Sequence, residues 1–261
     1  MIEFNLDQLY GWIGAFIWPF FRIAAFVGTA PVVGDSAVPI YVKVALAAIL
    51  SFALAPLTGD IPVIPLGSLA AIGVMVEQIL IGMALGLVMR FVFGAVIMAG
   101  ELIGLQMGLS FASFFDPASG GNTSVMARLL NALAILVFIA VNGHLVMLSG
   151  LGRTFEMLPI DGPRLDLNGI GVVVEFSVTL FTMSVALALP MVIALLAINL
   201  AMGILNRTAQ QLSVFAVGFP ITLTVSLMLL TVFLPQINDF LDRLFLDGYT
   251  AMSEVARGFG R

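Results

Sequence analysis

The sequence contains two adjacent stretches of 31 residues without a charged side chain, 176–206 and 208–238, separated only by Arg207. As an α-helix at about 1.5 Å per residue, each stretch would be about 46 Å long and would exceed the bilayer's hydrocarbon core of about 30 Å. Helices of that length must tilt, kink or project beyond the bilayer, and Pro190 and Pro220 are candidate kinks. The pattern predicts a long helical hairpin of a membrane protein.

The remainder of the chain has the same apolar character. Hydrophobic residues make up 61% of the 261 residues and charged residues 10%, whereas soluble domains have about 25% charged residues. Apolar segments of spanning length occupy residues 9–30, 39–57, 66–89 and 129–148, and the apolar segment 91–115 is interrupted by Glu101. We therefore predict an all-α integral membrane protein with about six long, kinked apolar helical segments, including the C-terminal hairpin.

Several functional classes find no support in the residues. The net charge is −5 with a single lysine and no basic stripe, so no nucleic-acid partner is expected. Cysteine is absent and His144 is the single histidine, so a metal centre or other cofactor is not expected. The sequence has neither a phosphate-binding loop of the G-x-x-x-x-G-K-[ST] type nor a G-x-S-x-G motif. We expect a protein that is not an enzyme.

Four ionisable residues lie in or beside apolar segments: Arg22, Lys43, Glu77 and Glu101. An ionised side chain there costs several kcal/mol unless it is paired or hydrated. One interpretation is a proton or ion relay, as in a small-solute secondary transporter that uses Glu77 and Glu101 as coupling groups. The other is that Arg22, Glu77 and Glu101 are buried charges in structural contacts within the chain or between subunits.

Small residues recur at a spacing of four on two apolar segments. Gly82 and Gly86 form one such pair, and Gly100, Gly104 and Gly108 form a longer series. Glycine faces of this kind allow helices to approach closely in a membrane. They predict helix-packing surfaces, either within this chain or against other subunits.

An aromatic segment follows the second glycine series and leads into a Gly-Gly loop. Its candidate gating residues are Gln106, Met107, Phe111, Phe114, Phe115, Asp116 and Pro117. Phenylalanines with a methionine can line a hydrophobic constriction that resists water and ions. They can equally be ordinary core aromatics at the end of a helix.

The order and spacing of these motifs resemble the FliR/SctT family of type III export-gate proteins. The resemblance covers nearly the whole chain and rests on Arg22 and Pro31, Glu77 with Gly82 and Gly86, Gly100 through Gln106-Met107-Gly108 to Asp116-Pro117, Asn142-Gly143-His144, and 206–215 leading into Gly218-Phe219-Pro220. Many family members have Pro-Gln-Leu-Asn at the hairpin tip, where this chain has Gln210-Gln211-Leu212-Ser213.

The resemblance implies a subunit of the inner-membrane pore that passes unfolded flagellar subunits. Such a chain assembles with FliP and FliQ homologues among membrane lipid. Residues 1–171 would be FliP-like, 172–238 a FliQ-like hairpin and 239–261 a short amphipathic tail. Residues 106–122 would be the pore plug. The hairpin tip, about 206–213 with Arg207, Gln210 and Gln211, would point toward the cytoplasmic entrance near an FlhB homologue.

Overall fold

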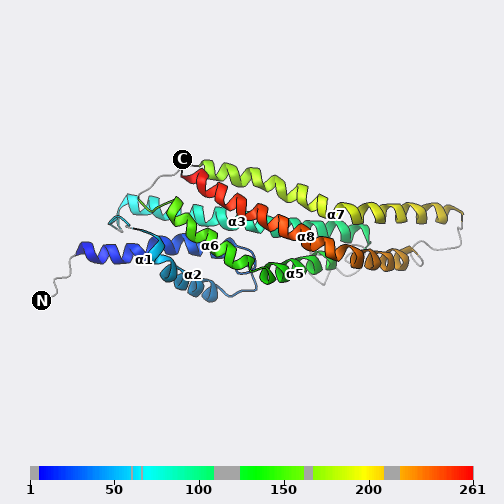
Figure 1. Cartoon of the computed structure of the whole chain (residues 1–261), viewed down its shortest axis with the longest axis horizontal. Helices are drawn as coiled ribbons and strands as arrows, with labels where there is room; N and C mark the ends of the chain where they lie inside the picture. Colours follow the sequence, from blue (N-terminus) through cyan, green and yellow to red (C-terminus); the bar gives the residue numbers. More distant parts are fainter. Residues whose placement is uncertain are drawn as a thin grey trace. The chain divides into compact units, whose positions relative to one another are not determined.

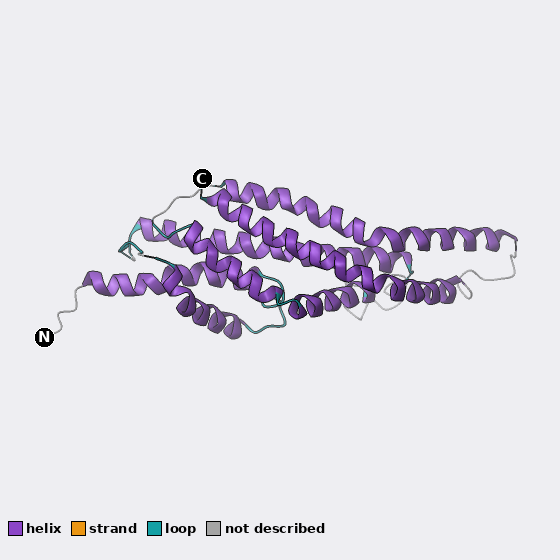
Figure 2. Ribbon diagram, in the orientation of Figure 1, coloured by secondary structure: helices purple, strands orange, loops and turns teal. Residues whose placement is uncertain are grey.

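The computed structural model describes residues 6–59, 61–65, 67–108, 124–161, 167–208 and 218–260. Over these residues the chain forms seven α-helices and one short 3-10 helix, with no β-strand (Figures 1 and 2). Within the same ranges five helices are long and apolar enough to cross a membrane, or six spans when one broken helix pair is counted. The predicted all-α membrane architecture is confirmed.

The first two helices are α1 (Leu6–Thr29) and α2 (Ile40–Leu54), and the 3-10 helix η1 (Ala55–Leu57) extends α2 (Figure 1). Pro39 stands at the N-cap of α2, where its missing N–H leaves no helix hydrogen bond broken. Lys43 donates from Nζ to the carbonyl oxygen of Gly34 at 3.0 Å. This lysine therefore fastens the turn between the two helices.

A single helix, α3 (Leu69–Gln106), continues over 38 residues. The sequence pattern predicts two segments here, 66–89 and 91–115, because Arg90 interrupts the apolar run. Arginine has a high helix propensity, so one charged residue does not end a helix. The helix ends instead at Gln106, and Gly108 has a φ of 78°, the left-handed conformation that commonly follows the last turn of a helix.

The predicted span 129–148 is wrong as one continuous helix, because two helices occupy this region. These are α5 (Val125–Ala140) and α6 (Gly143–Met157). The break lies at Asn142, which has a φ of 56°, and asparagine is one of the few residues that enter the left-handed region readily. The Asn142 carbonyl accepts the N–H groups of Leu145 and Val146 at 2.9 and 3.2 Å, which starts the new helix.

The two last helices, α7 (Asn168–Thr208) and α8 (Phe219–Phe259), have 41 residues each. Pro190 lies inside α7 as predicted, whereas Pro220 is the second residue of α8, where proline fits the first turn. Pro235 is the proline inside α8. The helix continues to Phe259, so the described residues of the predicted 239–261 tail are the end of α8.

The residue contacts divide the chain into two compact units. Unit 1 comprises residues 1–91, 142–177 and 245–261, and unit 2 comprises 92–141 and 178–244. Thus α3, α7 and α8 contribute residues to both units. The division at residues 171 and 238 that the resemblance implies stays a prediction.

Candidate functional site

Arg22 of α1 is fully buried in unit 1, where it contacts α3 and α6. Its Nε donates to Oε1 of Gln78 at 2.7 Å. Its Nη1 donates to the carbonyl oxygen of Thr154 at 3.0 Å and to the Thr154 hydroxyl at 3.3 Å, and its Nη2 donates to the carbonyl oxygen of Leu158 at 2.9 Å. All three guanidinium nitrogens are therefore engaged.

The guanidinium occupies the C-terminal end of α6. The last carbonyl groups of a helix have no partner within the helix and carry the negative end of its dipole, so a cation is stabilised there. The Arg22 guanidinium also lies 4.3 Å from the centre of the Phe155 ring, within range of a cation–π interaction. Glu77 of α3 adds an attractive electrostatic interaction. Arg22 thus acts as a side-chain cap that joins three helices.

The Gly82 and Gly86 pair packs against α1 beside Arg22. A Cβ on Gly82 would collide with the carbonyl oxygen of Arg22, and one on Gly86 would collide with the Thr29 hydroxyl. The absence of these side chains is what allows the backbones of α1 and α3 to meet. At these two positions, the space beside the glycine is filled by the chain's own helix.

The second glycine series meets the start of α5, within unit 2. A Cβ on Gly100 would collide with the backbone of Ala127, and one on Gly104 would lie 2.8 Å from the hydroxyl oxygen of Ser124. Gly108 follows the end of α3 and has a φ of 78°, and its place in this packing face stays a prediction.

Glu101 binds the same end of α5. Its Oε1 accepts the backbone N–H of Ser124 at 2.9 Å. The Ser124 hydroxyl oxygen in turn accepts the N–H of Ala127 at 3.1 Å, which is the usual N-cap contact of a helix. A carboxylate at a helix N-terminus is also favoured by the helix dipole. We call Gly100, Glu101, Gly104 and Ser124 the clasp.

The clasp bears on the candidate gating segment, because residues 109–123 connect α3 to Ser124. Met107 is buried, with 2% of its surface exposed, and the Gln106 carbonyl oxygen accepts from Asn199 Nδ2 at 3.3 Å. The five gating candidates that follow, Phe111, Phe114, Phe115, Asp116 and Pro117, lie outside the described residues, as do Gln210 and Gln211 of the hairpin tip. Arg207 is exposed near the end of α7.

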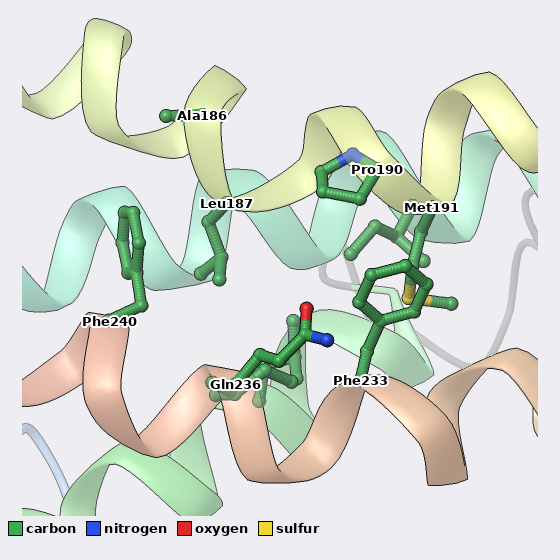
Figure 3. Close-up of a pocket in the computed structure, with 10 residues that line it drawn as sticks. Ala186, Leu187, Pro190, Met191, Phe233, Gln236 and Phe240 are labelled. Carbon is green, nitrogen blue, oxygen red and sulfur yellow. The ribbon is translucent and has the colours of Figure 1, made fainter.

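Unit 2 also contains a mainly apolar pocket of about 100 Å³. Figure 3 shows Leu187 and Met191 from α7, and Phe233 and Gln236 from α8, directed into the space between these helices. Pro190 lines the same space, and as a proline it cannot donate to the carbonyl of Ala186. The pocket therefore lies where α7 has lost one helix hydrogen bond. It carries no cluster of ionisable side chains and offers no chemistry of its own.

Much of the apolar surface of the helices is not covered by the chain itself. In an apolar 18-residue window of each helix, only 11% of the residues are buried for α2 with η1, 17% for α7 and 22% for α8. On α2, for example, Tyr41 is 80% exposed and Phe52 is 79% exposed. Lipid or other protein chains must cover such surfaces.

Arg90 of α3 has no role in the predictions from sequence, where it only separates two apolar segments. It is exposed, and no hydrogen bond, ion pair or ring contact joins its side chain to another residue of the described ranges. The sequence signal was available, because Arg90 is preceded by 12 uncharged residues and followed by ten. A single charged residue between two uncharged stretches indicates that its side chain contacts a group outside its own helix.

These features define a multi-spanning helical membrane protein, in which Arg22 and Glu101 hold helix ends in place. Among the described residues, no three potential metal-ligating side chains cluster. Residues 13–248 match the family of bacterial export proteins, family 1. Over 257 residues the chain is 43% identical to flagellar biosynthetic protein FliR of Escherichia coli, covering 98% of this chain and 97% of that protein.

Two further relatives are FliR proteins as well. Flagellar biosynthetic protein FliR of Pectobacterium carotovorum is 44% identical over 98% of this chain and 97% of its own length. The FliR protein of Bacillus subtilis is 30% identical over 84% of this chain and 85% of its own length. The chain therefore belongs to the FliR family of bacterial export proteins, whose members are non-enzymatic components of export.

Proposed function

We propose that the chain is a subunit of the flagellar type III export gate in the bacterial inner membrane. In this proposal it assembles with FliP and FliQ homologues, and with an FlhB homologue at the entrance, into the pore that passes unfolded flagellar subunits. The observation that carries the proposal is the similarity to FliR proteins, which extends over 98% of the chain.

The uncovered apolar surface supports assembly with other subunits. Large side chains are exposed along α2, α7 and α8, and a single chain of this size covers little of them. In a hetero-oligomer, neighbouring helices would bury some of this surface and lipid would contact the remainder. The FliP-like segment at residues 1–171, the FliQ-like hairpin at 172–238 and the tail at 239–261 belong to the same proposal.

The clasp supports a plug at residues 106–122. Glu101 and Ser124 hold the chain on the two sides of this segment together, and Met107 is anchored in the unit. A segment with fixed ends and three phenylalanines can exclude water and ions from a pore and still be displaced by a protein chain. Arg207, Gln210 and Gln211 complete the proposal as the hairpin tip near the cytoplasmic entrance.

The contacts of Glu77 and Glu101 do not favour the alternative function, a small-solute transporter. The two carboxylates that would couple transport are already engaged, since Glu101 accepts the Ser124 N–H and Glu77 acts on Arg22. Family membership also favours protein export.

The export proposal is tested by deleting the gene in its own organism and measuring flagellar subunits in the culture medium. We expect secretion to stop and to return when the wild-type chain is supplied on a plasmid. Normal secretion by the deletion strain would exclude an essential role in export.

The plug proposal is tested by replacing Phe114 and Phe115 together with alanine. We expect the membrane to become permeable to small ions, because the aromatic side chains that exclude water are lost. A matched control is Phe181→Ala, since Phe181 is an exposed phenylalanine of α7 outside the segment. The readout is the growth and ion leak of cells that express the assembled gate. A tight membrane with the double variant present in the gate would refute the plug.

A further inference from the structure

Arg90 is an exposed arginine in the middle of a 38-residue apolar helix. Among the residues that the structure describes, nothing hydrogen-bonds to its side chain or pairs with its charge. An ionised guanidinium in apolar surroundings needs partners, because its desolvation costs several kcal/mol. A partner for this charge would therefore lie outside the described residues.

Arg22 shows what an arginine requires in the apolar helices of this protein. Four polar contacts and an aromatic ring surround its guanidinium. Arg90 belongs to the same unit and has none of these. The two carboxylates of its own helix, Glu77 and Glu101, already act on other groups.

The face of α3 that carries Arg90 is apolar on both sides of the charge. Met83 and Leu87 lie seven and three residues before it, Ile97 lies seven residues after it, and all three are partly exposed. This spacing is typical of a helix–helix seam. A Cβ on Gly94, four residues after Arg90, would lie 3.0 Å from the side chain of Leu180, so α7 already covers part of this face.

At about 57 Å, α3 is longer than the hydrocarbon core of about 30 Å, so its length would also allow Arg90 to lie at the level of the lipid phosphates. The apolar face on both sides of the charge favours a protein partner. A neighbouring protein helix covers both sides and can offer a carboxylate between them. The planar guanidinium suits a carboxylate, because two parallel hydrogen bonds can form.

We propose that Arg90 lies in an intersubunit contact and pairs with an aspartate or glutamate on a helix of a neighbouring gate subunit. The partner is thus an apolar helix with a single acidic residue facing α3. This inference rests on the proposed assembly with FliP and FliQ homologues.

A charge reversal at Arg90 tests the pairing. The chain is co-expressed with the FliP and FliQ homologues of its organism, purified in mild detergent, and the complex is quantified by native mass spectrometry. We expect Arg90→Glu to lower the yield of complex about tenfold or more, since like charges in an interface repel, and Arg90→Lys to keep most of it. The control is Arg243→Glu, an exposed arginine on the charged face of α8.

The outcomes separate the two proposals. Absence of a complex with the wild-type chain would count against the assembly itself. A complex that forms equally well with wild-type chain and Arg90→Glu would overturn the pairing alone.

A photo-cross-linking residue at position 90 identifies the neighbour directly. We expect a cross-link to a FliP or FliQ segment that has an aspartate or glutamate within one helical turn of the linked site. Cross-links to phospholipid alone, or to a segment without an acidic residue, would overturn the inference.

Discussion

Arg22 and Glu101, two charged residues in the apolar helices, each bind backbone groups at the end of another helix. Arg22 caps α6 through the carbonyl oxygens of Thr154 and Leu158, and Glu101 accepts a backbone N–H at the start of α5. Neither arrangement requires a proton to move. The side chains compensate for unsatisfied backbone groups at helix ends, which are costly where water is excluded.

We predict that Arg22→Leu destabilises the isolated chain by roughly 3 kcal/mol. Gln78 and the Leu158 carbonyl would lose their donor, and each buried unsatisfied group costs about 1–3 kcal/mol. Unfolding of the purified chain in detergent, followed by circular dichroism, measures the change. Arg153→Leu is the control, because Arg153 is exposed on α6. Equal stability of the two variants would show that Arg22 is not a cap.

The sequence identified Arg22, Glu77 and Glu101 as charges in unusual places, but not their partners. Arg22 and Thr154 are 132 residues apart. Spacing along the chain reveals neighbours within one helix, whereas contacts between helices depend on packing that single residues do not encode. The two interpretations, relay or structural contact, could therefore not be separated before the contacts were known.

At the level of helices, the sequence predicted most clearly that helices pack closely against each other at glycine residues. Gly82, Gly86 and Gly100 face another helix of the chain at a distance that excludes a side chain, and Gly104 faces the side chain of Ser124 at the N-cap of α5. Contact with other subunits through the same glycines stays a prediction. Replacement of Gly104 by leucine would first displace Ser124 of the clasp, so it tests packing within the chain as much as assembly.

We predict opposite effects for two glycine-to-alanine changes. Gly82→Ala should lower the free energy of unfolding by about 1–3 kcal/mol, because its methyl group meets the backbone of Arg22. Gly203→Ala should raise it by up to about 1 kcal/mol, because Gly203 lies inside α7 with open space around it and alanine is the better helix former. Thermal unfolding of both variants in detergent measures the difference. A stabilising effect of Gly82→Ala would contradict the close contact of α1 and α3.

Helix boundaries are harder to predict from this sequence than the helices themselves. The uncharged arms around Arg207 correspond to α7 and α8, because length and lack of charge suffice to indicate a long apolar helix. The break at Asn142 has a signal in the sequence, since Asn142-Gly143 is a turn dipeptide, but the apolar residues on both sides favour one span over 129–148. The continuity of α3 is hidden for the opposite reason, since Arg90 resembles a boundary between two apolar segments.

On the scale of the whole molecule, the chain leaves much apolar helix surface exposed, as a subunit of a larger assembly would. Long apolar faces on α2, α7 and α8 remain uncovered, and Arg90 has no partner among the described residues. The sequence predicted the fold class, the membrane character and the family. The gating phenylalanines and the glutamines of the hairpin tip lie outside the described residues, so their roles stay proposals.

Membership of the export gate is tested most directly by native mass spectrometry of the chain co-expressed with the FliP and FliQ homologues of its organism. Purification through a tag on this chain, in mild detergent, should keep subunit contacts intact. The export-gate account predicts a discrete complex that contains this chain with several copies of both partners. A lone monomer or homodimer, under conditions in which FliP and FliQ remain associated with each other, would contradict it.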